Sequence, residues 1–138
     1  MKTAVRYYSR SGNTQKLAEA IAKALGTAAE IAEVPIAEPV DLLFIGGALY
    51  AGNMDEQLKK LAKSLTGEIV KRVAVFSTAA SGKPLQPKVK ELLEGKGIVV
   101  LDETFAGKGK FLLANKGRPD DSDCEAAAAF AKKLTGRQ

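Results

Sequence analysis

Segments typical of strands and of helices alternate along all 138 residues, and this alternation limits the fold more than any other feature of the chain. Strand-like runs are expected at residues 3–8, 29–34, 41–48, 72–77 and 98–101. Apolar residues recur at helical spacing over about 17–25, 55–65, 85–93 and 122–134. This order requires right-handed crossovers and predicts an α/β three-layer sandwich, with a five-stranded parallel sheet and helices on both faces. Because no repeat or linker interrupts it, we expect one domain spanning residues 1–138.

The strand-like run at residues 41–48 is apolar almost without interruption. Strands have this composition when helices cover both faces of a parallel sheet, because neither face then meets water. By contrast, residues 105–120 fit no helix or strand pattern. An irregular loop of that length in a compact domain is usually functional or structurally tied down.

A short polar loop joins the first strand to the first helix, and it contains three hydroxyl side chains, an amide and a glycine. Its sequence is Ser9-Arg10-Ser11-Gly12-Asn13-Thr14. The first amides of a helix have no partner within the helix, so an anion there gains hydrogen bonds and a favourable interaction with the helix dipole. Hydroxyls add further donors, and Gly12 lets the backbone approach closely. The same residue types also cap ordinary helices, so the loop is either a phosphate cradle or only a helix cap.

The loop has no lysine, which argues against phosphoryl transfer. A nucleotide-hydrolysing loop needs a lysine and a metal-binding hydroxyl in fixed order. The nearest approach to that pattern is Ser81-Gly82-Lys83-Pro84, which has Pro84 where Ser or Thr is required and Ser77 in place of the leading glycine. The 9–14 loop therefore suits a phosphate monoester that is held rather than transferred.

The composition excludes several kinds of active site. The chain has no histidine, which rules out imidazole metal ligands, Ser-His triads and histidine bases. Its one cysteine, Cys124, cannot form a disulfide or ligate a cluster within one chain, and we expect a bystander rather than a redox thiol. The longest apolar run is too short to cross a bilayer, and no signal-peptide pattern precedes the first strand. We therefore expect a cytoplasmic protein without a membrane span.

The net charge of +5 lies entirely in the second half of the chain. Residues 1–70 carry 8 basic and 8 acidic residues, whereas residues 71–138 carry 13 basic and 8 acidic. The basic residues are mostly scattered lysines, without the arginine clusters and aromatic platforms of nucleic-acid-binding proteins, so we expect no nucleic-acid partner. Most of them fit solvated helix surfaces. The exception is a cluster that could dock an acidic protein, formed by Lys108, Lys110, Lys116 and Arg118.

The loop at residues 9–14 resembles the phosphate-binding signature of flavodoxins, Thr/Ser-x-Thr/Ser-Gly-x-Thr, at every defined position. The order of strands and helices is similar to that family over essentially the whole chain. The resemblance implies the strand order 2-1-3-4-5 and a non-covalently held FMN. It also implies a site beyond the carboxyl ends of the strands, where the strand order reverses; flavodoxin is itself one of the known examples of that rule. The chain departs from the family in being basic, where many flavodoxins are acidic.

Three loops would hold the FMN in a protein of this family. The 9–14 loop would bind the phosphate. The loop after residues 41–48 has Tyr50 for stacking on the flavin ring and Gly52, whose freedom lets a peptide change direction. The loop after residues 72–77 is small and polar, without the aromatic residue that many relatives have there. The resemblance implies no catalytic or metal-binding residue, and the following cofactor-binding residues: Ser9, Arg10, Ser11, Gly12, Asn13, Thr14, Leu49, Tyr50, Ala51, Gly52, Asn53, Ser77, Thr78, Ala79, Ala80, Ser81 and Gly82.

The resemblance leaves two functions open. One is an electron carrier, expected to be a monomer, that works between redox proteins, including acidic ones. The other is an FMN-dependent oxidoreductase of the quinone reductase or protoporphyrinogen dehydrogenase type, favoured by the segment Gly52-Asn53-Met54 and by the basic charge. The absence of a histidine for a quinone pocket, and of a large insertion for a shared dimer site, favours the carrier. A phosphoacceptor signalling domain is excluded because Tyr8-Ser9 and Gly46-Gly47 stand where its acidic residues would be.

Overall fold

The computed structural model describes residues 1–10, 12–50, 53–78, 85–107 and 121–136. The main strands are β1 (Thr3–Tyr7), β2 (Ala29–Ile31), β3 (Val40–Gly47), β6 (Val70–Thr78) and β7 (Val99–Gly107). They form one parallel sheet in the order β2-β1-β3-β6-β7. Two short strands, β4 (Leu49–Tyr50) and β5 (Asn53–Met54), pair separately as an antiparallel hairpin. Because β6 and β7 are thus the fourth and fifth strands of the main sheet, the predicted order 2-1-3-4-5 is confirmed.

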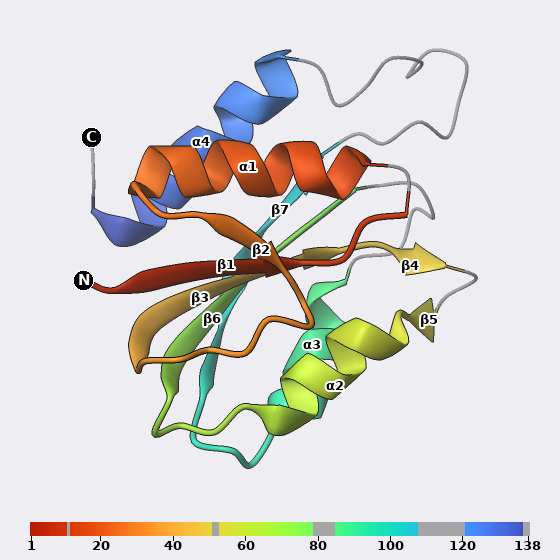
Figure 1. Cartoon of the computed structure of the whole chain (residues 1–138), viewed down its shortest axis with the longest axis vertical. Helices are drawn as coiled ribbons and strands as arrows, with labels where there is room; N and C mark the ends of the chain where they lie inside the picture. The colour runs from red at the N-terminus through yellow and green to blue at the C-terminus, as the bar shows by residue number, and fades with distance from the viewer. Residues whose placement is uncertain (11, 51–52, 79–84, 108–120, 137–138) are drawn as a thin grey trace.

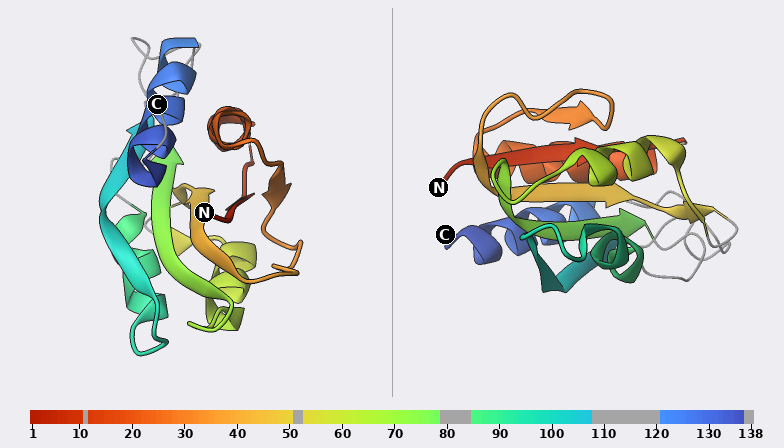
Figure 2. Two further views of the ribbon diagram at one scale, coloured as in Figure 1. Left: turned by 90° about the vertical axis from the view of Figure 1, so that its left-hand side faces the viewer. Right: turned by 90° about the horizontal axis from the view of Figure 1, so that it is seen from below.

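Four helices in the part of the chain that the structure describes cover the two faces of the sheet. Helices α1 (Asn13–Leu25) and α4 (Asp121–Thr135) pack together on one face. Helices α2 (Glu56–Ser64) and α3 (Gln86–Leu93) lie on the other, as Figures 1 and 2 show. The predicted three-layer sandwich is therefore confirmed. None of the helices that the structure describes is long and apolar enough to cross a membrane.

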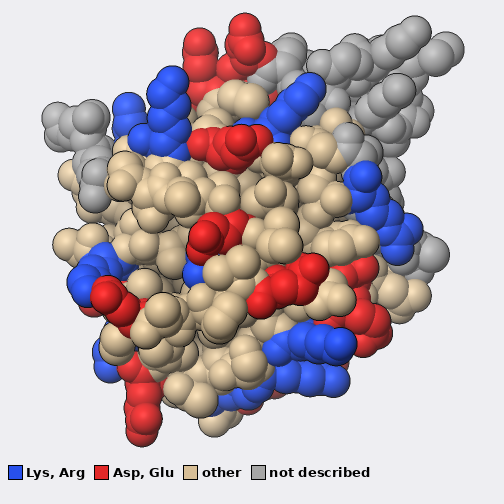
Figure 3. Space-filling view, viewed as in Figure 1, with Lys and Arg blue, Asp and Glu red and all other residues tan. Residues whose placement is uncertain are grey.

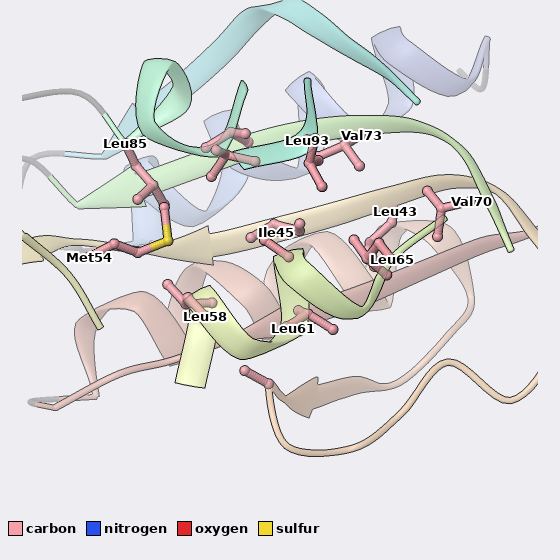
Figure 4. Close-up of a cluster of buried hydrophobic side chains, with 14 of the residues drawn as sticks. Leu43, Ile45, Met54, Leu58, Leu61, Leu65, Val70, Val73, Leu85 and Leu93 are labelled. Carbon is pink, nitrogen blue, oxygen red and sulfur yellow. The ribbon is translucent and has the colours of Figure 1, made fainter. Parts of the chain in front are cut away.

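An apolar core fills the space on each side of the sheet. The core under α2 and α3, drawn in Figure 4, includes Leu43 and Ile45 of β3 together with Leu58, Leu61, Leu65, Leu85 and Leu93. The core under α1 and α4 includes Phe44 of β3 with Val5, Leu17, Ile21 and Phe76. Successive residues of a strand point to opposite faces, so the apolar side chains from Leu42 to Ile45 of β3 serve the two cores alternately. This explains the continuous apolar run in the sequence.

Two glycines end β3 because neighbouring side chains occupy the space above and below the strand. A Cβ atom on Gly46 would clash with the ring of Phe76, and one on Gly47 would clash with Leu58. The large side chains on β6 and α2 therefore pack directly on the β3 backbone. Residues 46 and 47 must be glycine for both layers to approach the sheet this closely.

Strand β7 is longer than predicted. The pattern predicts a strand over residues 98–101 and irregular structure from residue 105, but β7 continues to Gly107. The exposed residues Asp102 and Glu103 interrupt the apolar pattern and hide the continuation. Pairing with β6 nevertheless continues after a register irregularity, and the hydroxyl of Thr104 donates a hydrogen bond to the Val75 carbonyl at 2.7 Å. The remainder of the predicted irregular region, residues 108–120, lies outside the described residues.

An aromatic contact also holds this part of β7 in the fold. The ring centroids of Phe105 and Phe130, a residue of α4, lie 5.9 Å apart. The Phe130 ring also packs edge-on against the Phe44 ring, with 6.1 Å between their centroids. Such contacts stabilise the docking of α4 onto the sheet. They explain why residue 105 belongs to the sheet rather than to a loop.

Strand β2 is shorter than the predicted 29–34 run: it ends at Ile31, because the chain turns after that residue. Arg6 on β1 holds this turn: its Nε donates to the Val34 carbonyl at 2.8 Å and its Nη2 to the Pro35 carbonyl at 3.0 Å. The side chain is buried, and Glu30 lies 3.3 Å from its guanidinium. The pKa of Arg6 is lowered because burial disfavours its charged form, and this effect outweighs the nearby Glu30 carboxylate, which acts to raise the pKa. Arg6 thus fixes a connection to β3 that contains no helix.

Candidate functional site

The carboxyl ends of four neighbouring strands lie in register at one edge of the sheet. Tyr7 of β1 pairs with Gly46 of β3, and Ser77 of β6 pairs with Gly47 on one side and Ala106 on the other. The chain leaves β1 toward β2 and later returns to place β3 on the other side of β1. The strand order therefore reverses between β1 and β3, which is where open α/β sheets bind ligands.

The described residues of the loop after β1 form a short turn at this edge, just before helix α1. Gly12 has a positive φ of 87°, which a residue with a side chain rarely adopts, and α1 begins at the next residue. The backbone N–H of Gly12 donates a hydrogen bond to the Ser9 hydroxyl at 2.9 Å. At the start of helix α1, the Lys16 N–H donates a hydrogen bond to the Gly12 carbonyl at 3.1 Å. The N–H groups of the three residues between them have no partner in the helix, as at any helix start.

The start of α1 has the donors that a phosphate needs. No side chain in the described part of the chain caps this helix, and its first turn carries no acidic residue. Apart from its chain neighbours and the adjoining turn of the helix, an ideal Cβ built on Gly12 meets no described residue within 4 Å, so there is open space beside the turn. Amides without a partner in the helix, a nearby hydroxyl, the positive end of the helix dipole and open space together suit a bound anion.

The other predicted residues of the first loop differ in exposure. Thr14 is 2% exposed, Ser9 and Asn13 are half-buried, and Arg10 is exposed. Ser11 lies outside the described residues. The structure thus brings Ser9, Gly12, Asn13 and Thr14 together at the start of α1. It leaves Arg10 at the surface.

The second predicted loop is a β-hairpin, which the sequence pattern did not predict. Leu49 of β4 pairs with Met54 of β5, and Tyr50 pairs with Asn53. The side chain of Leu49 is buried in the core under α2 and α3, whereas Asn53 is exposed. Ala51 and Gly52, which connect the two strands, lie outside the described residues. Figure 1 shows this hairpin at the same end of the molecule as the first turn of α1.

The third predicted loop begins at the end of β6. Ser77 and Thr78 are each 3% exposed and belong to the sheet. Ala79, Ala80, Ser81 and Gly82 lie outside the described residues. The structure adds the end of β7 to this edge, because Thr78 pairs with Gly107. The sequence pattern does not predict this neighbour, because residues 105–107 match no strand pattern.

Comparisons with known proteins agree with this architecture. The family model for the flavodoxin domain matches residues 4–112, which include β1 from its second residue, the first loop and the hairpin. No curated protein sequence matches the chain. Among solved structures, oxidised flavodoxin 2 from Bacillus cereus superposes with a TM-score of 0.70 at 18% identity, covering 99% of each chain.

Two other solved structures share the fold over nearly the whole chain. A flavodoxin variant from Pseudomonas aeruginosa has a TM-score of 0.63 and 19% identity, covering 99% of this chain and 100% of its own. An NAD(P)H:quinone oxidoreductase from Methanothermobacter marburgensis has a TM-score of 0.54 and 14% identity, with coverages of 97% and 96%. These structural similarities establish the fold, and the match to the family model establishes the family. The chain therefore belongs to the flavodoxin family.

Proposed function

We propose that this protein binds one FMN non-covalently at the carboxyl edge of its sheet and carries electrons between redox partners. The observation that carries the proposal is the start of α1 after Gly12, which no described side chain caps and which lies where the strand order reverses. A terminal phosphate fits this turn, because it can accept hydrogen bonds from several amides and hydroxyls at once.

Different residues of the chain would bind different parts of the cofactor. Ser9, Gly12, Asn13 and Thr14 would hold the phosphate through hydroxyls and backbone amides. The β4–β5 hairpin, with Tyr50 and Asn53, would border the ring, and the end of β6 at Ser77 and Thr78 would meet its polar edge. The isoalloxazine ring of FMN supplies the one- and two-electron chemistry when it is bound. No acidic or basic side chain is needed for that role, which suits a chain without histidine.

The family membership and the first loop support an FMN site, and the absence of a histidine for a quinone pocket favours the carrier. As a carrier, the protein would act as a monomer in the cytoplasm. An FMN-dependent oxidoreductase is the second candidate, and it shares the same cofactor site.

Two measurements on the purified full chain test the proposal. An absorbance spectrum after incubation with FMN and removal of free flavin should show one bound flavin per chain. The loaded protein should accept electrons from a flavoprotein reductase and pass them on to a redox protein. It should oxidise NADPH only slowly when quinone is the sole acceptor. Rapid NADPH oxidation with quinone would instead assign the protein to the oxidoreductases, and absence of bound flavin would refute both functions.

A further inference from the structure

The two helical layers differ in charge. Helices α2 and α3 together carry five lysines and two glutamates, a net charge of +3. Helices α1 and α4 carry four basic and four acidic residues, a net charge of zero. Figure 3 shows basic side chains gathered along the part of the surface where α2 lies. The excess charge of the helices is therefore concentrated on one side of the sheet.

A groove of about 170 Å³ lies on that side, between α2, α3 and the β4–β5 hairpin. Met54 and Leu92 supply apolar surface, and both side chains pack in or against the core under α2 and α3. Lys59 of α2 and Lys88 of α3 line the groove, together with Asn53 and Glu91. The groove thus combines an apolar surface, where an apolar side chain can be buried, with two lysines from different helices.

The lysines of the groove are available to a partner. Lys59 lies 3.4 Å from Glu56, but the Glu56 side chain is 75% exposed, and exposed pairs of this kind contribute little. Lys88 is exposed and forms no ion pair with any residue that the structure describes. Lys60 and Lys63 add exposed positive charge along α2. Glu91 is the one acidic residue among those that line the groove.

We propose that this groove docks an acidic redox protein. Carboxylates of the partner would lie near Lys59 and Lys88, and an apolar side chain would cover Met54 and Leu92. The inference rests on the proposed function, because Asn53 and Met54 belong to the hairpin that would border the flavin. Docking beside this hairpin would bring the partner's redox centre close to the cofactor. These residues are distinct from Lys108, Lys110, Lys116 and Arg118, the docking candidates of the sequence analysis, which lie outside the described residues.

An NMR titration of the FMN-loaded full chain tests the proposal, with an acidic iron–sulfur ferredoxin as the probe. At low salt, the Asn53 side-chain amide and the Met54 methyl group should shift on addition of ferredoxin. The shifts should weaken as salt rises, because ions screen the attraction. The double variant Lys59→Gln/Lys88→Gln should weaken binding by about fivefold or more, whereas Glu91→Gln should strengthen it by about twofold.

The matched control is Lys23→Gln/Lys132→Gln, which removes the same charge from a groove between α1 and α4 on the opposite side of the sheet. It should change the affinity by less than about twofold. Equal effects of the two double variants would overturn the proposal, since net charge alone would then explain binding. Tighter binding of a basic cytochrome c would overturn it too. So would binding of a single-stranded oligonucleotide at the groove without any binding of ferredoxin.

The same experiment separates the two claims. FMN affinity is measured for every variant before the titration, and the groove variants should bind FMN as the wild-type chain does. If the wild-type chain binds no FMN, the proposed function fails, while the ferredoxin titration can still be run on the flavin-free chain. If FMN binds but the ferredoxin leaves Asn53 and Met54 unshifted, the docking proposal alone is wrong.

Discussion

Gly12 and Gly26 flank helix α1 with similar backbone conformations, and only one of them lies at the candidate site. Their φ angles are 87° and 72°, and a Cβ built on either meets no atom within 4 Å. A side chain would therefore fit at both positions but would strain the backbone equally. Substituting each glycine in turn therefore separates two effects: the loss of stability from a left-handed residue with a side chain, and the loss of affinity from a disturbed candidate site.

We predict that Gly12→Ala and Gly26→Ala each lower the free energy of unfolding by about 1–2 kcal/mol, the cost of a left-handed conformation for a residue with a Cβ. Only Gly12→Ala should also weaken FMN binding, by about tenfold, because it alone moves amides of the phosphate turn. Urea unfolding and flavin-fluorescence titration measure the two effects. Equal loss of FMN affinity in both variants would show that the turn at Gly12 has no special role.

Ser9 gives a second test at the residue scale. Its hydroxyl accepts a hydrogen bond from the Gly12 N–H and is only half-buried, so it can also face a ligand. Ser9→Ala should weaken FMN binding by about 1–2 kcal/mol, as expected for a lost hydrogen bond to a charged group. Ser64→Ala is the control, because the Ser64 hydroxyl donates only to the Leu61 carbonyl at the end of α2. Unchanged FMN affinity in Ser9→Ala would remove this hydroxyl from the site.

At the scale of elements, helix α2 depends on a side-chain cap, whereas no described side chain caps α1. The Asp55 carboxylate accepts a hydrogen bond from the Gln57 N–H at 2.8 Å. Asp55→Ala should lower the free energy of unfolding by about 1 kcal/mol, whereas Asp55→Asn, another good capping residue, should lower it less. Thermal unfolding of the two variants measures the difference. If both lost the same stability, the charge of Asp55 rather than its cap would be responsible.

Strand β3 can be tested through its close packing. Gly46→Ala should destabilise the protein by about 1–3 kcal/mol, because the added methyl group would have to displace the ring of Phe76. Combining it with Phe76→Leu should recover part of that loss, since a smaller side chain leaves room. Urea unfolding of the single and double variants measures the coupling. Strictly additive losses would contradict the packing seen between β3 and β6.

Much of the element order could be predicted from the sequence, since strands and helices that serve an apolar core repeat with characteristic periods. The five main strands and the four described helices were predicted from these periods, whereas the strand order followed from the resemblance to flavodoxins. The extension of β7 was missed because Asp102 and Glu103 are exposed, and only pairing with β6 and the Phe105–Phe130 contact keep the strand in the sheet. The β4–β5 hairpin was missed because two-residue strands leave no period to recognise.

The candidate site could be predicted only as far as local sequence determines it. The first loop is contiguous, so its hydroxyls and glycine were recognisable, and the structure places Gly12 in the left-handed conformation that the motif requires. Contacts between distant segments were not predictable in this way. The approach of Asn53 and Met54 to Lys88 and Leu92, which forms the groove, depends on how α2 and α3 pack side by side.

At the scale of the whole molecule, the sheet separates two surfaces with different charge and brings the candidate loops to one edge. The central claim is that this edge holds FMN by its phosphate. Flavin-fluorescence titration of the flavin-free full chain with FMN, riboflavin and FAD tests it most directly. We predict one FMN per chain, bound at least about tenfold more tightly than riboflavin, as one or more hydrogen bonds to a charged phosphate would give, and more tightly than FAD. Equal affinity for riboflavin and FMN would contradict the account and would leave the 9–14 loop as only a helix cap.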